Sequence, residues 1–263
     1  MYKHILNLFP EHKTYVEGFG GAGHVIFSKK PSGVDVYNDI HEGLYNLFKV
    51  LRDKELSQEL IYRLQLTPYS RKEYEDCRDS WRYEEDDVEK ARKFYTSVIQ
   101  SFNCLGRTWK YSKTIHRKGM SQTVSSWLNK IDNKMIDIVE RSREIQIENK
   151  DILDLIDTYD NKDTLFYLDP PYVPETRKNK KAYKYELSAD DHVKLVNRIL
   201  NIEGKVILSG YENDIYKKLE ENGWSKILLG EYHIKSAGKN NKKGKEFIWI
   251  NYSISDISNK KYA

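Results

Sequence analysis

The sequence has few cysteines and no arrangement typical of a metal site. Only Cys77 and Cys104 occur among 263 residues. Two cysteines in a chain of this length form no disulfide framework, and their spacing does not suit a set of metal ligands. We therefore expect no bound metal and a reducing intracellular setting, the cytoplasm.

Long apolar segments are also missing. No stretch approaches the roughly 18 apolar residues that span a membrane, and residues 1–10 lack the apolar run and small-residue cleavage site of a signal peptide. The charge is nearly balanced, because 44 Lys and Arg face 40 Asp and Glu, for a formal net charge of +4. Such a balance tolerates a polyanionic partner but does not demand one, so the placement of basic residues matters more than their sum. From the missing apolar segments we expect no membrane partner.

A cluster of glycines follows a short extended segment near the start of the chain. Residues 15–17 read as a strand and run directly into Gly18, Gly20, Gly21 and Gly23. The hydrophobic pattern then predicts a helix over residues 22–29, a strand over 34–38 and a helix over 41–52. This order of strand, glycine turn, helix and strand is typical of a nucleotide-binding α/β unit.

The glycine cluster differs from loops that bind phosphate. It lacks the Gly-x-Gly-x-x-Gly spacing of a pyrophosphate binder, and no Gly-Lys-Ser/Thr follows it. Asp39 lies 16 residues beyond Gly23, at the end of the next strand, where a carboxylate can accept hydrogen bonds from two ribose hydroxyls. Either motif alone is as typical of a turn or a helix cap as of a ligand site. The pair favours a nucleoside ligand without phosphate, and S-adenosylmethionine is the commonest of these.

The tetrapeptide Asp169-Pro170-Pro171-Tyr172 follows a buried-type strand over residues 164–168. The exocyclic amine of adenine is a poor nucleophile, because its lone pair is delocalised into the ring. Two fixed acceptors, the Asp169 carboxylate and the Pro170 carbonyl, could bind the amine hydrogens and favour attack on a methyl group. Tyr172 would stack on a base flipped out of the duplex. The alternative interpretation is a Pro-Pro turn that ends a strand and leaves a surface tyrosine.

Together these motifs resemble the Dam-type family of DNA adenine-N6 methyltransferases. The likeness covers nearly the whole chain, with the motifs in the family's order. Residues 15–23 resemble the cofactor motif, 36–40 its ribose-binding successor, 144–151 the segment that contacts the adenine of the cofactor, and 165–172 the catalytic motif. Residues 209–211 and 246–252 are similar to the family's later strands. Asp at the first catalytic position is typical of adenine enzymes, whereas cytosine-N4 and glutamine methyltransferases commonly have Ser and Asn there.

The resemblance implies specific roles for residues of this chain. It implies S-adenosyl-L-methionine as cofactor and double-stranded DNA as substrate. The implied catalytic residues are Asp169, Pro170, Pro171 and Tyr172. The implied cofactor-binding residues are Glu17, Phe19, Gly21, Gly23, Asp39, Asp151 and Asp169.

Two departures from the family pattern concern the cofactor site. Aligning Phe9-Pro10 with the family puts its aromatic–x–Gly-Gly-Lys element before residue 1. Either the chain is a truncated reading frame, or the cofactor site is completed differently. Gly18 also stands where the family usually has proline, which we expect to loosen that turn. Both departures should weaken cofactor binding.

The fold implied by these patterns is α/β, a Rossmann-like methyltransferase sheet that is mostly parallel with an antiparallel last strand. Residues 1–52 and 139–263 would form the catalytic domain. Residues 53–138 break the alternation of strands and helices and would form an inserted, mainly helical subdomain for DNA target recognition. The predicted helices cover residues 57–66, 70–80, 87–102, 152–158, 189–200 and 213–222. The further predicted strands cover 144–147, 205–209, 227–229 and 247–252.

Three basic stretches are candidates for DNA contact. The first, residues 107–118, carries Arg107, Lys113 and Arg117 among aromatic residues, with Ser121 close behind. The second follows the catalytic motif and includes Arg177 and Lys178. The third is the lysine-rich segment 235–245. Each stretch could equally be a solvated loop, and the sequence does not separate phosphate contacts from base contacts.

The leading hypothesis is therefore a monomeric, site-specific enzyme that methylates the amino group of a flipped adenine in duplex DNA. Two alternatives remain at this point. One is a catalytically impaired, methyltransferase-derived module that only binds DNA. The other is an RNA adenine-N6 methyltransferase, against which the large insert argues.

Overall fold

The computed structural model describes residues 2–176, 185–234 and 242–257. It divides the chain into two compact units. The first comprises residues 1–40 and 146–263, and the second comprises residues 41–145. We describe each unit by itself.

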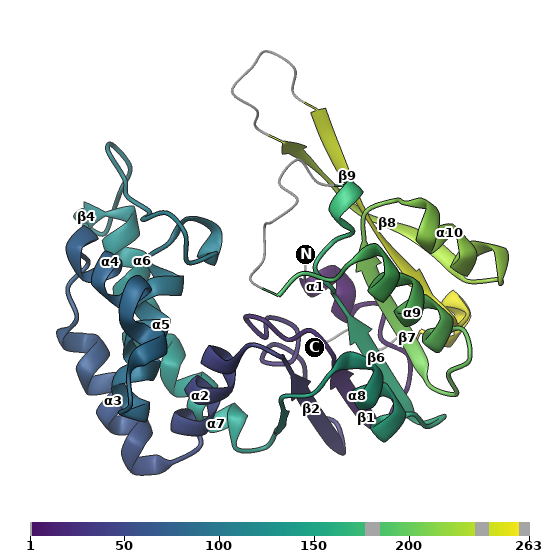
Figure 1. Ribbon diagram of the computed structural model, residues 1–263, viewed down its shortest axis with the longest axis horizontal. Coiled ribbons are helices and arrows are strands. Elements are labelled where there is room, and N and C mark those ends of the chain that lie inside the picture. The colour runs from purple at the N-terminus through teal and green to yellow at the C-terminus, as the bar shows by residue number, and fades with distance from the viewer. Residues whose placement is uncertain (1, 177–184, 235–241, 258–263) are drawn as a thin grey trace. The chain divides into compact units, whose positions relative to one another are not determined.

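The first unit is built on a seven-stranded sheet (Figure 1) with the order β5-β2-β1-β6-β7-β9-β8. Strands β5, β2, β1, β6 and β7 are parallel to one another, whereas β9 is antiparallel to both β7 and β8. This sheet confirms the predicted mostly parallel, Rossmann-like architecture. The strands are β1 (Thr14–Glu17), β2 (Val34–Asn38), β5 (Gln146–Glu148), β6 (Thr164–Leu168), β7 (Lys205–Gly210), β8 (Ser225–Ile234) and β9 (Lys242–Ile250).

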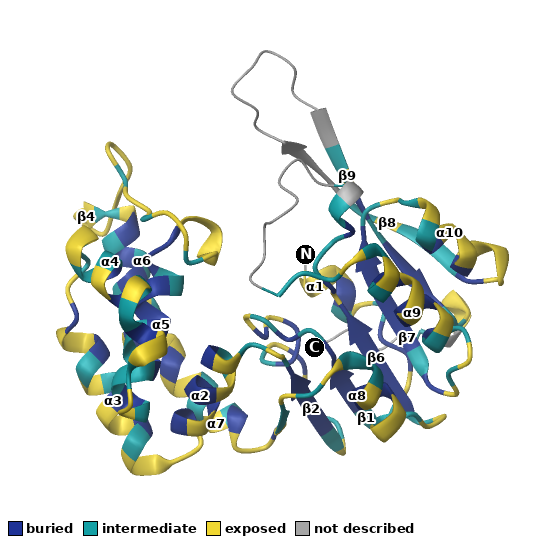
Figure 2. Cartoon of the chain, viewed as in Figure 1, coloured by how far each residue is buried: buried dark blue, intermediate teal, exposed yellow. Residues whose placement is uncertain are grey.

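The two-residue period of the strands explains how the sheet is covered. Alternate residues such as Val16, Phe166 and Val206 share one apolar cluster with the inner faces of three helices. Figure 2 shows the strands as the buried centre of the unit and the helices as exposed on their outer sides. The helices are α8 (Ile152–Tyr159), α9 (Ala189–Ile199) and α10 (Asp214–Glu221), with a short α1 (Tyr2–Leu6) at the start of the chain.

Side-chain caps fix where these helices begin. Asp151 caps α8, and Asn213 caps α10. Ser188 and Asp191 form a reciprocal capping box at the start of α9. Each cap satisfies amide groups that the helix cannot satisfy internally, which is why short polar residues stand at these positions.

The predicted helix over residues 22–29 is wrong. The segment is a series of turns, in which Gly21 and Gly23 adopt positive φ angles of 49° and 63°. The amide of Ile26 donates to the buried carboxylate of Glu17 at 2.8 Å, instead of to a carbonyl one helical turn earlier. A side chain from β1 has therefore replaced part of the hydrogen bonding that a helix would need.

The second unit is mainly helical. It also contains a two-stranded hairpin that the sequence did not indicate, in which Lys118 and Gly119 adopt positive φ angles of 54° and 75°. The helices are α2 (Glu42–Leu51), α3 (Lys54–Leu66), α4 (Arg71–Ser80), α5 (Asp87–Ile99), α6 (Gln122–Asn129) and α7 (Met135–Ser142); the strands are β3 (His116–Arg117) and β4 (Met120–Ser121). Segments 41–52 and 139–145, assigned above to the catalytic domain, belong by their contacts to this unit, because α2 packs against α5, α3 and α7.

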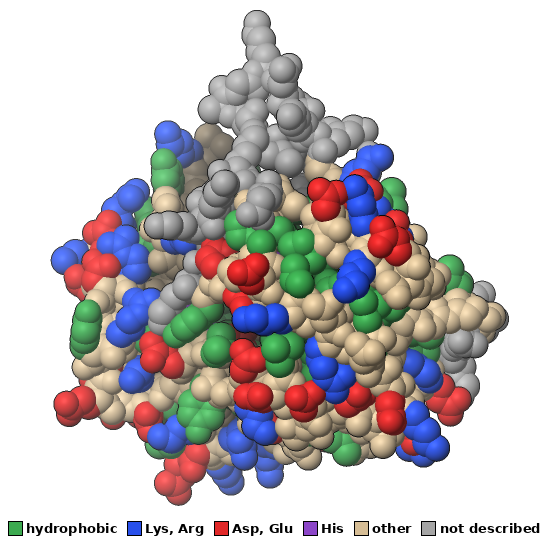
Figure 3. Space-filling view, turned by 45° about the vertical axis from the view of Figure 1, so that its right-hand side comes forward, with side chains coloured by type: hydrophobic (Ala, Val, Ile, Leu, Met, Phe, Trp, Pro, Cys, Tyr) green, Lys and Arg blue, Asp and Glu red, His purple; other side chains and the backbone are tan. Residues whose placement is uncertain are grey.

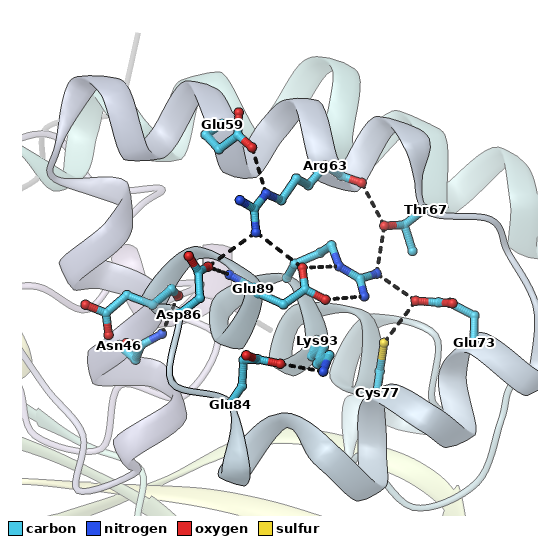
Figure 4. Close-up of polar contacts among 12 residues, drawn as sticks. Asn46, Glu59, Arg63, Thr67, Glu73, Cys77, Glu84, Asp86, Glu89 and Lys93 are labelled. Atoms are coloured by element: carbon cyan, nitrogen blue, oxygen red, sulfur yellow. Dashed lines mark hydrogen bonds and ion pairs between the residues drawn. The ribbon is translucent and has the colours of Figure 1, made fainter.

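A network of ion pairs joins α3, α4 and α5, and Figure 4 labels its members Arg63, Glu73 and Glu89. Arg92 of α5 donates to Glu73 at 2.7 Å and to Thr67 at 3.0 Å. It also makes two hydrogen bonds with Glu89 on its own helix, at 2.9 and 2.7 Å. The Arg92 side chain is only 14% exposed, so these bonds compensate the cost of burying its charge. Arg63 of α3 extends the network to Glu89.

No helix within the described part of the chain combines the length and apolar character needed to cross a bilayer.

Candidate active site

Asp169 stands at the carboxyl end of β6, where burial changes abruptly. All five residues of β6 are buried, and so is Pro170, whereas Asp169 itself is exposed. Its carboxylate oxygen Oδ1 accepts a hydrogen bond of 2.6 Å from the Ser209 hydroxyl on the neighbouring strand β7. An accessible carboxylate at the end of a central parallel strand is in the usual position of a ligand-binding group in α/β sheets.

The surroundings of Asp169 raise its pKa to about 6. Protein atoms around the carboxylate disfavour its charged form, and the negative charge of Glu246 adds to this, whereas the hydrogen bond from Ser209 acts in the opposite direction. The group is therefore mostly ionised at neutral pH and becomes protonated in mild acid.

The carbonyl of Pro171, the second proline after Asp169, contacts a buried histidine on α9. His192 has no exposed surface, and its Nε2 lies 3.0 Å from the Pro171 carbonyl. A carbonyl only accepts, so Nε2 carries a proton. The Nδ1 atom, 3.0 Å from the Tyr216 hydroxyl, then accepts from Tyr216 in the neutral ring. The sequence did not point to His192 or Tyr216, because one polar residue on the apolar face of a helix looks like a packing residue.

Tyr172 is held at both its ring and its hydroxyl. The hydroxyl donates to Glu246 Oε1 at 2.5 Å, and the ring centroid lies 4.2 Å from that of Tyr211 at an angle of 48°. Glu246 comes from β9, and Tyr211 follows β7 directly. Both lie in segments that resemble the family's later strands, but the sequence gave neither of them a role at the site.

The glycine loop and Asp39 are joined to each other. The Gly21 amide donates to Asp39 Oδ2 at 2.9 Å, and the Gly21 carbonyl accepts from the Tyr37 hydroxyl at 2.6 Å. A Cβ atom on Gly20 would lie 2.1 Å from the Tyr37 ring, so the ring and the loop are in direct contact. Asp39 is half-buried, and this leaves part of it accessible beside the loop.

Glu17 lies beneath this loop and contacts protein groups. Its side chain is 2% exposed, and Oε2 accepts from the Tyr15 hydroxyl and the Ile26 amide, both at 2.8 Å. Burial raises the pKa of Glu17 to about 8, against the lowering effect of these two hydrogen bonds. The carboxyl group thus holds the loop in shape, which differs from the cofactor contact that the sequence suggested for it.

Asn38 connects the loop to the segment before α8. Its side-chain nitrogen donates to the carbonyls of Gly18 and Lys150, at 3.0 and 3.2 Å, and its oxygen accepts from the Lys150 amide at 2.8 Å. The connection sets Asp151 next to the carboxyl ends of β1 and β2. Asp151 is exposed, and one of its oxygens caps α8 by accepting from the Leu153 amide.

Gly18 does not loosen the turn as expected. Its amide donates to the Tyr167 carbonyl at 3.0 Å, a bond that proline could not make. A side chain at this position would meet Ile152 and Leu168 at 2.6 and 2.7 Å. The residue therefore extends the pairing of β1 with β6. Phe19 follows it and packs, half-buried, against the core of the sheet.

Comparison with known proteins identifies this arrangement. The D12 class N6 adenine-specific DNA methyltransferase family matches residues 1–235. The chain belongs to this family. It is also similar to the Type II methyltransferase M.MjaIII of Methanocaldococcus jannaschii, with 26% identity over 261 aligned residues that cover 91% of this chain and 89% of the relative. The chain is thus an adenine-specific DNA methyltransferase, as the Asp169–Tyr172 motif indicated.

The predicted DNA-contacting residues of this methyltransferase divide into three groups. Arg107, Lys113 and Arg117 are exposed on the second unit. Ser121 already has partners in the protein, since its hydroxyl caps α6 and contacts Thr123. Arg177 and Lys178, together with most of the lysine-rich segment 235–245, lie outside the described residues.

The exposed basic stretch of the second unit also contains an aromatic and cationic stack. The rings of Trp109 and Tyr111 are nearly parallel, with centroids 5.8 Å apart. The Arg71 guanidinium lies 4.6 Å from the Trp109 ring and 5.5 Å from the Tyr111 ring. Such stacks bind the charge and the flat faces of nucleic acids.

On the face that Figure 3 shows, Lys and Arg side chains are interspersed with Asp and Glu. Among the residues described, no group of three or more His, Cys, Asp or Glu could hold a metal ion.

Proposed function

We propose that this methyltransferase transfers the methyl group of S-adenosyl-L-methionine to the N6 atom of an adenine flipped out of double-stranded DNA, acting as a monomer at a specific site. The observation that carries the proposal is the accessible carboxylate of Asp169, which stands at the end of an otherwise buried strand and beside two prolines. A carboxylate that must bind a substrate amine has to be accessible, fixed and ionised, and Asp169 meets all three conditions.

The residues of the glycine loop suit a nucleoside with a sulfonium centre. The open backbone at Gly21 and Gly23 lets a ligand approach closely, and the half-buried Asp39 can accept hydrogen bonds from ribose hydroxyls. Asp151 stands nearby with one oxygen engaged in a cap, which leaves the other for the adenine of the cofactor. When bound, the cofactor would supply an activated methyl group.

The chain's own residues would then activate the amine. Asp169 and the Pro170 carbonyl accept the two hydrogens of N6, which localises the nitrogen lone pair toward the methyl group. The hydrogen bond from His192 to the Pro171 carbonyl restricts rotation of the neighbouring peptide groups. Tyr172 provides the stacking surface for the extruded base, a contact worth about 1–3 kcal/mol.

The second unit would recognise the target sequence. The exposed Arg107, Lys113 and Arg117 are suitable for contacts to phosphates or base edges. A Type II relative suggests that the chain serves in a restriction-modification pair.

Substitution of Asp169 tests the proposal. We expect Asp169→Ala to lower methyl transfer by at least about 10²–10³-fold, because a preorganised contact to the reacting amine is lost, while DNA affinity stays within a few-fold. The assay follows tritium transfer to unmethylated genomic DNA and to RNA, with N6-methyladenine identified by nucleoside mass spectrometry. Asp154→Ala, at an exposed position on α8, is the matched control. Wild-type turnover in Asp169→Ala, or transfer to RNA alone, would contradict the proposal.

A further inference from the structure

The buried carboxylate of Glu246 has no evident structural purpose. Glu246 is 3% exposed on β9, and its Oε1 atom accepts from the Tyr172 hydroxyl. Among the residues that the structure describes, no cation forms an ion pair with it. Burial of a carboxylate without a cation among these residues costs several kcal/mol, and an apolar residue would pack there at lower cost. A residue that is costly for folding and lies next to a catalytic motif is a candidate for a role in the reaction.

The first effect of Glu246 is on the orientation of Tyr172. Pro170 and Pro171 restrict the backbone before the tyrosine, and Tyr211 supports its ring at 4.2 Å. The remaining freedom is rotation of the ring and its hydroxyl, and the hydrogen bond to Glu246 removes it. The Tyr172 ring is therefore ordered before a base arrives, so that base binding does not bear the entropy cost of ordering it.

The second effect is electrostatic. The charge of Glu246 raises the pKa of Asp169, so the two carboxylates interact across the site. During methyl transfer the N6 nitrogen would form a bond to the methyl carbon as the bond between that carbon and the donor sulfur breaks, which leaves the donor as a neutral thioether. The nitrogen gains positive charge and then releases one proton to solvent. A second negative charge beside Asp169 stabilises this developing positive charge.

We propose that Glu246 is a positioning residue for adenine methylation, holding Tyr172 in its stacking orientation and adding negative charge beside Asp169. The proposal rests on the proposed function above. The Asp169–Tyr172 motif does not reveal this role, because Glu246 lies 74 residues from Tyr172 in the sequence.

Other groups around Asp169 must be considered before a pH effect is assigned to Glu246. Ser209 on β7 is a hydrogen-bond donor that stabilises the carboxylate. Glu17 on β1 is affected by the charge of Asp169. Among the residues that the structure describes, that charge also raises the pKa of the hydroxyls of Tyr167, Tyr172 and Tyr216. The charge of Glu246 raises the pKa of Asp169, whereas the hydrogen bond from Ser209 lowers it. Removing the charge of Glu246 should therefore lower the pKa of Asp169, and removing the hydroxyl of Ser209 should raise it.

The test compares Glu246→Gln with Tyr172→Phe. The glutamine oxygen still accepts from the tyrosine hydroxyl but carries no charge, whereas phenylalanine removes the hydrogen bond and leaves the charge in place. We expect Glu246→Gln to lower kcat about tenfold and to move the acid limb of the kcat/KM profile to lower pH. We expect Tyr172→Phe to lower kcat without moving the acid limb of the kcat/KM profile. The fluorescence of 2-aminopurine at the target position reports how much of the base is flipped out, and Tyr172→Phe should reduce it.

Controls separate this role from a purely structural one. Glu221→Gln removes an equal charge from an exposed position on α10 and should leave both kcat and the acid limb unchanged. Calorimetric titration with S-adenosyl-L-methionine and thermal unfolding verify that the Glu246 variant is folded. An unshifted acid limb in Glu246→Gln, even with a lower melting temperature, would overturn the proposal. A wild-type chain that transfers no methyl group to DNA would instead overturn the proposed function, and this inference with it.

Discussion

The hydrogen bond from Ser209 to Asp169 leads to a quantitative prediction about pH dependence. The Ser209 hydroxyl is buried and lies 2.6 Å from Asp169 Oδ1. It stabilises the ionised carboxylate, so its removal in Ser209→Ala should raise the pKa of Asp169 further above about 6. In the proposed mechanism it is ionised Asp169 that accepts the amine hydrogens, and the variant should therefore lose activity at a higher pH than the wild type.

The size of the effect follows from the strength of the bond. A hydrogen bond to a charged group contributes about 1.5–3 kcal/mol, and a pKa unit corresponds to about 1.36 kcal/mol. Because Asp169 is accessible to solvent, water replaces part of the lost interaction. We therefore expect the acid midpoint to rise by about one unit, with activity on the alkaline plateau reduced only a few-fold.

The assay is the pH profile of kcat/KM for DNA between about pH 5 and 9, because this parameter reports the ionisation of the free enzyme. The wild type should lose activity through a midpoint near pH 6. Ser225→Ala, on β8 of the same sheet, is the matched control and should keep that midpoint. An unchanged or lower midpoint in Ser209→Ala would refute the assignment of the acid limb to Asp169.

Two further predictions concern stability. Gly20→Ala would place a Cβ atom 2.1 Å from the Tyr37 ring. We expect it to reduce the free energy of unfolding by about 1–3 kcal/mol in chemical denaturation. Gly230→Ala is the control, because a Cβ atom there meets no atom within 4 Å, and it should change the free energy of unfolding by less than about 0.5 kcal/mol. Equal effects of the two substitutions would contradict the close contact at the loop. Arg92→Met removes the ion pairs of Arg92 with Glu73 and Glu89, of which, among the described residues, only Glu89 keeps a second cation, Arg63. We expect it to destabilise the helical unit by about 3 kcal/mol, measured as a lower thermal midpoint. Lys72→Ala, at an ion pair whose lysine is 80% exposed, should have little effect. An unshifted midpoint in Arg92→Met would show that the network contributes no stability.

Local patterns were sufficient to predict most of the sheet and the helices around it. The strand before Asp169 was predictable because five consecutive buried-type residues end at two prolines. Helix starts were predictable where a short polar residue precedes an apolar period, as at Ser70 and Asp86. Prediction failed over residues 22–29, because a side chain nine residues away takes the Ile26 amide. Such competition depends on tertiary position and leaves no local pattern.

The site was predictable only for residues within the motifs. Asp169 and Tyr172 were candidates from one tetrapeptide, whereas His192 and Glu246 join the candidate site through contacts to residues 21 and 74 positions away in the sequence. Their roles follow from which strand lies beside which, and that order is set by the crossovers of the sheet. The short hairpin in the second unit was also missed, since two-residue strands carry no measurable alternation.

The interruption of the sheet by a complete helical unit has a consequence for the order of folding. β1 and β2 are synthesised first, but the central partner of β1 is β6, which begins only at residue 164. Closing so long a loop is entropically unfavourable for a disordered chain. Residues 41–145 form their own compact unit, so they can fold on the ribosome and shorten the effective loop before β6 emerges. We therefore expect variants that unfold the helical unit to delay assembly of the sheet, even though they alter none of its strands.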